Sequence, residues 1–201
     1  MNDRRCKTGF QARWVALVTI LLAAFAVGCG SDEELSDGGA PESQALPLVG
    51  TYVGKVSDSD AYIALNSDGA QVGGYVSDGG QVSIWLAPSD VDEGPADLVA
   101  RRDGARLGEV ILGPQSASGT VEIAGVEHSF SAAPATGEAG LYRSLEGVAG
   151  APGFEETGWV VLSDGSEKGS TNITDETGNT RTRPAPERTT EPKVTDPTTD
   201  I

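Results

Sequence analysis

The stretch Thr51–Pro88, TYVGKVSDSDAYIALNSDGAQVGGYVSDGGQVSIWLAP, decides the fold. Its apolar and polar residues alternate, and the alternation is interrupted by Ser67-Asp68-Gly69 and Ser77-Asp78-Gly79-Gly80. Alternation with a period of two is typical of strands with one buried face, and Asp-Gly and Gly-Gly pairs are typical of tight hairpin turns. The stretch therefore predicts short antiparallel strands that follow one another in hairpins.

The same pattern continues outward from this stretch, and no part of it shows helical periodicity. About ten short strands are predicted, at 49–56, 61–66, 71–76, 81–87, 97–102, 106–112, 118–123, 126–132, 140–145 and 158–163. Many short strands with tight turns favour an all-β antiparallel meander, closed into a barrel or folded into a sandwich. We expect this β domain to occupy residues 47–170.

Four segments of the chain resemble a known group of domains. They read TYVGKVSDSDAYIALNSDG, GGYVSDGGQVSIWLAP, EAGLYRS and GWVVLSDG, and the likeness covers most of residues 50–165. They look like uncharacterised β-domains found in secreted bacterial proteins and lipoproteins. The resemblance implies one β domain. Because that family has no assigned activity, the resemblance implies no catalytic residue.

The N-terminus reads as a targeting segment. A basic stretch is followed by the 14-residue apolar run Trp14–Val27, which is too short for a membrane span and fits a signal peptide over residues 1–28. Ala26-Val27-Gly28-Cys29 resembles the lipobox of bacterial lipoproteins, in which the cysteine receives diacylglycerol and becomes the N-terminus. We therefore expect a palmitate-bearing anchor at Cys29. The alternative is ordinary cleavage after Ala24-Phe25-Ala26, which would release a soluble protein.

Two polar segments flank the predicted domain. Residues 29–46 are acidic and rich in Gly and Ser, so they predict a flexible tether after the acylated cysteine. Gly30 in place of aspartate after Cys29 favours outer-membrane sorting if the cell is Gram-negative. Residues 171–201 are dominated by Thr, Pro and charged residues, with little to bury, and are predicted to be a disordered tail.

The charge balance of the chain excludes some partners. The chain has 30 acidic and 14 basic residues, a net charge of −16. Four of the basic residues and one acidic residue precede Cys29, so removal of residues 1–28 leaves 29 acidic and 10 basic residues and a net charge of −19. Such a surface repels phosphate backbones and is not attracted to anionic lipid. We expect no nucleic-acid partner, and a bilayer contact made through the acyl group.

An aromatic pattern supplies the candidate binding residues. Within the predicted strands, Tyr62, Tyr75 and Trp85 alternate with aliphatic residues, which places them together on the more polar face of the sheet. They share this face with Asn66, Gln71 and Ser83. Rings beside amides and hydroxyls suit a platform for a glycan or an extended peptide. Cross-strand aromatic packing explains the same pattern, and we favour packing over the platform.

No catalytic or metal-binding constellation is evident in the sequence, and no cofactor is expected. The only histidine, His128, has none of the partners that a triad or a multi-histidine metal site needs, so we favour a structural role. Asp90–Gly94 resembles the start of a calcium loop, but Arg101 stands where an EF-hand needs glutamate. A solvated acidic loop is the preferred interpretation.

These observations favour a non-enzymatic envelope lipoprotein whose β domain binds a cell-wall glycan, a peptide or an envelope protein. A carrier barrel with an internal apolar cavity is the first alternative. A hydrolase that uses carboxylates, such as Asp58 and Asp60, is the second. The carrier hypothesis depends on whether the barrel is hollow or filled by side chains.

Overall fold

Residues 48–92 and 94–198 are described by a computed structural model of the protein. The predicted signal peptide 1–28, the predicted acylation site Cys29 and the predicted tether 29–46 lie outside the described residues. Within the described ranges, no helix is both long enough and apolar enough to cross a membrane.

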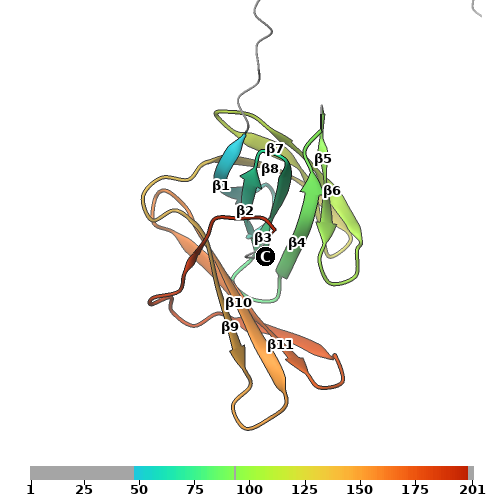
Figure 1. The fold of residues 1–201 in the computed structure, drawn as a ribbon, viewed down its shortest axis with the longest axis vertical. Coiled ribbons are helices and arrows are strands. Elements are labelled where there is room, and N and C mark those ends of the chain that lie inside the picture. The colour runs from blue at the N-terminus through green and yellow to red at the C-terminus, as the bar shows by residue number, and fades with distance from the viewer. Residues whose placement is uncertain (1–47, 93, 199–201) are drawn as a thin grey trace, which may run out of the picture. The chain divides into compact units, whose positions relative to one another are not determined.

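The first eight strands form a closed antiparallel barrel (Figure 1). Each strand pairs with the next along the chain, and the last strand pairs back with the first. The all-β meander predicted from the sequence is confirmed, and it is a barrel rather than a sandwich. The strands are β1 (Val49–Val56), β2 (Tyr62–Asp68), β3 (Gln71–Ser77), β4 (Ser83–Asp90), β5 (Ala96–Ala100), β6 (Arg106–Leu112), β7 (Ala117–Ile123) and β8 (Val126–Pro134).

The interior of the barrel is filled by aliphatic and aromatic side chains. Ile63 and Leu65 on β2 and Val76 on β3 point inward and are fully buried with side chains from the other strands. An eight-stranded barrel is just wide enough for its own side chains to fill. This packing favours a filled barrel over a hollow one.

Five further strands form a second sheet beside the barrel. They are β9 (Gly140–Gly147), β10 (Gly153–Val161), β11 (Glu167–Asp175), β12 (Thr180–Pro184) and β13 (Lys193–Val194), and their order in the sheet is β12-β11-β10-β9-β13. Two predictions from the sequence are wrong here. Residues 171–198 are not a disordered tail, because they supply most of β11 and all of β12 and β13, and the folded domain does not end at residue 170. The stretch between the predicted strands 140–145 and 158–163 is not a continuous loop, because β9 extends to Gly147 and β10 already begins at Gly153.

The polar C-terminal strands fold because their side chains satisfy one another. The hydroxyls of Thr157 and Thr171 lie 2.8 Å apart in the buried centre of the sheet, and those of Thr174 and Thr180 lie 2.8 Å apart nearer its edge. Buried polar groups are tolerated when they are hydrogen-bonded, and β-branched threonine suits a strand. Residues 171–198 therefore fold although few of their side chains are apolar, and for this reason the disorder predicted from composition is wrong.

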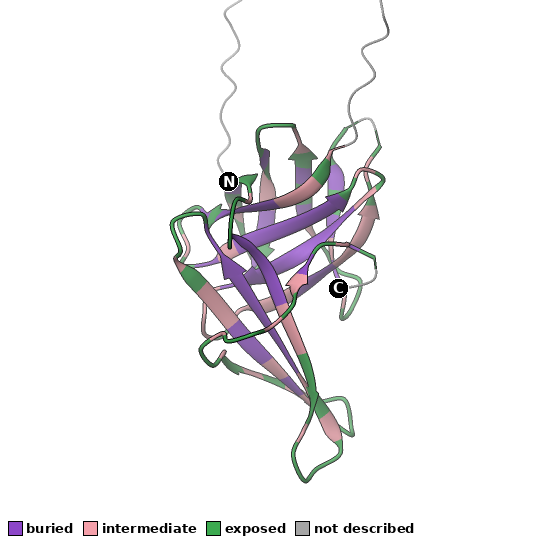
Figure 2. Ribbon diagram, turned by 60° about the vertical axis from the view of Figure 1, so that its left-hand side comes forward, coloured by how far each residue is buried: buried purple, intermediate pink, exposed green. Residues whose placement is uncertain are grey.

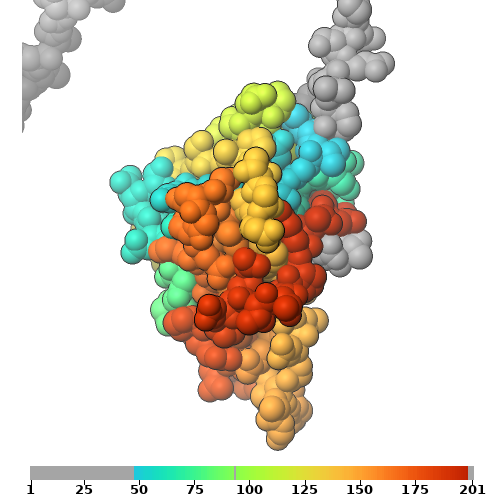
Figure 3. Space-filling model, turned by 90° about the vertical axis from the view of Figure 1, so that its left-hand side faces the viewer, coloured from blue at the N-terminus to red at the C-terminus, as the bar shows by residue number. Residues whose placement is uncertain are grey.

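Residues 185–192, which we name the strap, cross the sheet from β12 on one edge to β13 on the other. Figure 3 shows this C-terminal part of the chain (red) lying over the strands of the sheet (orange). Trp159 on β10 donates its indole N–H to the Pro186 carbonyl at 3.0 Å. The Arg188 guanidinium lies 4.0 Å from the ring centroid of Tyr142 on β9. The strap thus covers the aromatic residues on the face of the sheet that points away from the barrel.

Candidate functional site

The six residues predicted to share a polar face do lie on the outside of the barrel. Ala64 pairs with Tyr75, and Tyr75 pairs with Trp85, so the two rings stand side by side on neighbouring strands. Their centroids are 4.4 Å apart. The alternation in the sequence therefore assigns this face correctly.

The face is not an exposed platform, because the second sheet covers it. Tyr75 is 0% exposed and Trp85 is 5% exposed, and both pack with Leu141 and Val160 of the sheet. A Cβ atom added to Gly158 on β10 would lie 2.7 Å from the Tyr75 ring and 2.8 Å from the Trp85 ring. Figure 2 shows the buried residues (purple) concentrated where the sheet meets the barrel. The packing interpretation therefore holds for Tyr75 and Trp85, and an exposed platform of the two rings is wrong.

Two polar members of the predicted platform fasten the sheet and the C-terminal strands to the barrel. The Asn66 side-chain amide, fully buried, donates to the carbonyl of Val194 on β13 at 3.2 Å. The Ser83 hydroxyl lies 2.9 Å from the Tyr75 hydroxyl, which also donates to the carbonyl of Ser170 on β11 at 3.1 Å. These polar groups hold the two layers together.

The other two members lie nearer the solvent. The Tyr62 hydroxyl donates to the Ser166 hydroxyl at 3.3 Å, across to the turn between β10 and β11. The Gln71 amide donates to the Asp90 carboxylate at 2.9 Å, within the barrel wall. Neither residue lines the cleft described next.

A cleft of about 950 Å³ opens between the barrel and the barrel-facing side of the second sheet. Trp85 and Ser83 belong to its lining, so part of the predicted face does reach a cavity. The barrel contributes β4, the end of β5 with the turn that follows, and β6, while the sheet contributes β9 to β12. The lining residues are Ser83, Ile84, Trp85, Ala100, Arg101, Arg102, Asp103, Leu107, Arg143, Leu145, Phe154, Glu156, Asn172, Thr174, Gly178, Thr180 and Thr182.

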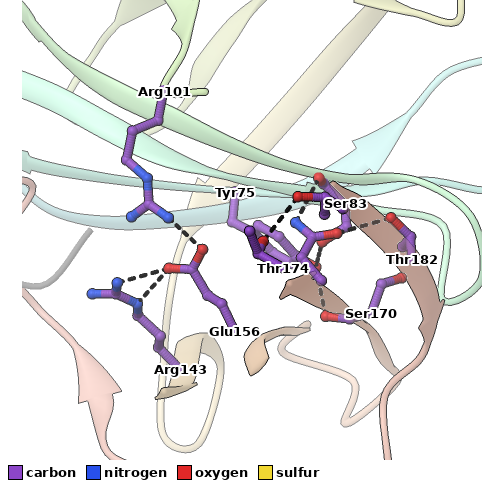
Figure 4. Close-up of polar contacts among 10 residues, drawn as sticks. Tyr75, Ser83, Arg101, Arg143, Glu156, Ser170, Thr174 and Thr182 are labelled. Atoms are coloured by element: carbon purple, nitrogen blue, oxygen red, sulfur yellow. Dashed lines mark hydrogen bonds and ion pairs between the residues drawn. The ribbon is translucent and has the colours of Figure 1, made fainter. Parts of the chain in front are cut away.

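An arginine–glutamate–arginine cluster stands at the centre of the lining. Arg101 reaches the buried Glu156 carboxylate from the barrel side and Arg143 reaches it from the sheet (Figure 4). Arg101 donates Nη2–H to Oε2, while Arg143 donates Nε–H at 3.0 Å and Nη2–H at 2.7 Å to Oε1. Both guanidinium carbons also lie 5.3 Å from the Trp85 ring centroid. The cluster therefore joins the two layers and presents two cations to the cleft.

One part of the cleft wall is apolar. Leu145 near the end of β9 is 59% exposed, and Phe154 near the start of β10 is 44% exposed. Both sit on the β9–β10 hairpin, whose tip is exposed in Figure 2. Ile84 and Leu107 line the cleft from the barrel and are partly buried. Exposed apolar residues beside a cavity mark a surface suited to a ligand.

Hydroxyl and amide groups line another part of the wall and are fixed by contacts among themselves. The Asn172 side-chain amide donates to the Ser83 carbonyl at 3.3 Å. The Thr182 hydroxyl donates to the Asn172 side-chain oxygen at 2.8 Å. These bonds tie β4 of the barrel to β11 and β12, so this part of the wall is held in place without a ligand.

The lining of the cleft has more cationic than acidic side chains, and it includes a buried hydrogen-bond donor without an acceptor. Three arginines face two acidic residues, Asp103 and Glu156, although the chain as a whole is strongly acidic. Trp85 is buried, yet within the described part of the chain its Nε1–H has no hydrogen-bond acceptor. A buried donor without an acceptor costs on the order of 1–3 kcal/mol. The site is therefore rich in donors and cations.

Burial also perturbs the tyrosine beneath the cleft. Desolvation raises the pKa of Tyr75 to about 12, because the ionised phenolate would lie among apolar groups of both layers. Hydrogen bonds from Ser83 and Ser77 lower the pKa and partly oppose this rise. Tyr75 is therefore a neutral hydrogen-bonding group at physiological pH.

The remaining sequence candidates lie elsewhere. His128 Nδ1 is 3.0 Å from the Ser57 carbonyl, which fits the structural role expected of it. Asp90 accepts the Gln71 amide, and Glu93 of the acidic loop lies outside the described residues. Within residues 48–92 and 94–198, no three His, Cys, Asp or Glu side chains gather as a metal site would need.

Sequence reasoning missed Arg101, Arg143, Glu156 and Phe154. Alternation along β10 is the local signal for Phe154 and Glu156. Every second residue from Phe154 to Val160 lies on the barrel-facing side of this strand. The glycine-rich sequence before Gly158 conceals that alternation. The two arginines come from different layers, and no local pattern connects them.

No protein-family model matches this sequence, no curated protein matches it, and no solved structure matches its fold. The cleft and its lining residues are therefore the observations from which a function is inferred.

Proposed function

We propose that the protein is a lipid-anchored lipoprotein of the bacterial cell envelope, and that its β domain binds a ligand in the cleft between the barrel and the second sheet. The anchor is the acylated Cys29, followed by the tether, with the outer membrane as the site if the cell is Gram-negative. The protein acts by binding rather than by catalysis.

The cleft is the single observation that carries this proposal. Its volume lies near the upper end of the range for pockets that hold small ligands, roughly 300–1,000 Å³. It combines apolar residues with a few fixed polar groups, as such pockets do. Both oxygens of its buried carboxylate, Glu156, accept hydrogen bonds from arginines, which supports a role in holding the site together rather than in proton transfer.

The filled barrel supports the cleft as the binding site in place of an internal cavity. The barrel interior is occupied by buried side chains, whereas the cleft walls carry exposed ones, such as Phe154 and Leu145. A ligand of the size of a short oligosaccharide, a short peptide or a small organic acid fits this setting.

The proposal is tested by mapping fragments onto the full-length chain with amide chemical-shift changes. The probes are neutral N-acetylglucosamine oligomers, short alanine peptides and small aromatic acids. For at least one class we expect saturable shifts confined to cleft residues such as Arg101, Phe154 and Asn172. Phe154→Ala should weaken that binding several-fold, because the exposed ring loses its contact with the probe.

A matched control is Ile111→Ala, because Ile111 is an exposed apolar residue of β6 that does not line the cleft. It should leave the binding unchanged. Shifts spread over the surface for every class of probe, or shifts that survive Phe154→Ala unchanged, would contradict the cleft as the binding site.

A further inference from the structure

We propose that the ligand of the cleft joins a carboxylate to an apolar group, so that arginines bind its charged end and the β9–β10 hairpin binds its apolar end. This inference rests on the proposed function and names the chemistry of the ligand. Neutral sugars and neutral peptides are the alternatives that the test separates from it.

Two arginines of the cleft, Arg101 and Arg102, retain side-chain hydrogen-bond donors that no described residue uses. A guanidinium carries five N–H groups, and Arg101 donates one of them to Glu156. Its other guanidinium N–H groups have no hydrogen-bond acceptor within the described part of the chain. Arg102 is exposed and forms no ion pair among the described residues. Arginine binds carboxylates in a two-pronged, charge-assisted geometry, so a ligand carboxylate is the acceptor that these side chains match.

The arginines are also held in position before a ligand arrives. Glu156 and the Trp85 ring fix the guanidinium groups of Arg101 and Arg143. A group that is already oriented loses less entropy on binding. Arg102 also lines the cleft, so the lining holds three arginines and two carboxylates, Asp103 and Glu156.

The charge of the whole protein does not override this local charge. A chain with a net charge of −16 repels anions at long range. At physiological salt the Debye length is about 8 Å, so exposed charges beyond that distance are largely screened. The arginines that line the cleft therefore decide whether an anion binds there.

The apolar end of the ligand has its own surface. Leu145 and Phe154 are exposed on the sheet side of the cleft, and Ile84 and Leu107 complete an apolar wall on the barrel side. The arginine cluster and this apolar wall are parts of one cavity, and two of their members, Phe154 and Glu156, are two residues apart on β10. An amphipathic acid can contact both at once.

The test uses 3-phenylpropionate and its neutral isostere 3-phenylpropionamide with the full-length chain, and ligand-observed NMR to measure Kd. We expect millimolar binding of the acid, as suits a fragment of this size. The amide should bind about tenfold more weakly, because it lacks the charge-assisted bonds to arginine. Acetate should bind more weakly still, because it has no apolar group.

Variants locate the two ends of the probe. Arg101→Gln and Arg102→Gln should each weaken binding of the acid, and Arg101→Gln should raise its Kd about tenfold. Neither variant should change the Kd of the amide. Arg102→Gln serves where Arg101→Gln fails to fold, because Arg102 has no ion pair with residues 48–92 or 94–198 to lose. Phe154→Ala should weaken the binding of the acid and of the amide to the same extent. The matched control is Arg106→Gln, an exposed arginine on β6 that is paired with Asp97 outside the cleft lining, and it should change neither.

Equal binding of acid and amide would overturn this inference while leaving the cleft a binding site. Acid binding that is unchanged by both Arg102→Gln and Phe154→Ala would also overturn it, because the acid would then bind elsewhere. No saturable binding of the acid would overturn it as well, and the fragment map described above would then decide the proposed function by itself.

Discussion

Trp85 links the packing of the protein to the chemistry of its cleft. Its ring packs against Tyr75 at 4.4 Å and lies 5.3 Å from the guanidinium carbons of Arg101 and Arg143. A desolvated cation–π contact contributes about 2 kcal/mol. The side chain that fills the space between barrel and sheet therefore also orients two arginines that line the cleft.

At the residue scale, Tyr75 predicts how stability depends on pH. Its pKa is about 12 in the folded protein and about 10 when unfolded. Below pH 10 both states keep the proton, so the free energy of unfolding does not change with this group. Between about pH 10 and 12 only the unfolded state loses the proton, so the folded state should lose about 2–3 kcal/mol.

Urea unfolding between pH 8 and 11.5 checks this prediction. Tyr75→Phe should flatten the fall in stability above pH 10, while costing about 1 kcal/mol at pH 7 through its lost hydrogen bonds. Burial also raises the pKa of Tyr52 and Tyr142, so some slope should remain. An unchanged slope in Tyr75→Phe would show that the phenol is not protected by burial.

At the scale of elements, the sequence predicts strands that pair with their neighbours in the chain, and it does not predict strands that are held by contacts distant in sequence. The hairpins of residues 51–90 follow from alternation and Asp-Gly turns, which act within a few residues. Strands β11 to β13 follow from long-range contacts, such as the bond from Asn66 to Val194, which no local pattern shows. The same holds for the cleft, because Arg101 and Arg143 meet only when the two layers pack together.

The contact between β10 and the barrel gives an element-scale prediction. Gly158→Ala would place a Cβ 2.7 Å from the Tyr75 ring, and overpacking of this kind costs typically about 1–3 kcal/mol. Thermal melts should therefore show a drop of several degrees.

Gly147→Ala is the matched control, because Gly147 also lies in a strand of this sheet and has nothing within 4 Å of the added Cβ. It should leave the melting temperature almost unchanged. Equal losses in the two variants would mean that the rings do not constrain β10.

At the scale of the whole molecule, the proposed anchor at Cys29 gives a prediction for the full-length protein. The strands and hydrophobic clusters of the β domain are built from residues 49–194, so we expect a change at Cys29 to leave the β domain intact. Full-length protein expressed in a bacterium should incorporate labelled palmitate and partition into detergent, and Cys29→Ser should lose both properties. The melting temperature of the domain should stay the same. A mature N-terminus at Val27, read by sequencing, would contradict the anchor and support cleavage after Ala26.

The two edges of the second sheet have a consequence for the order in which the chain can fold. Pairing within the barrel needs nothing beyond residue 134, but both edge strands of the sheet, β12 and β13, are made from residues 180–194. A chain that is synthesised from its N-terminus delivers the barrel first. Until the last strands arrive, the apolar outer face around Tyr75 and Trp85 lacks its full cover. That interval is when the incomplete protein is most exposed to aggregation, and when a chaperone would have most to protect.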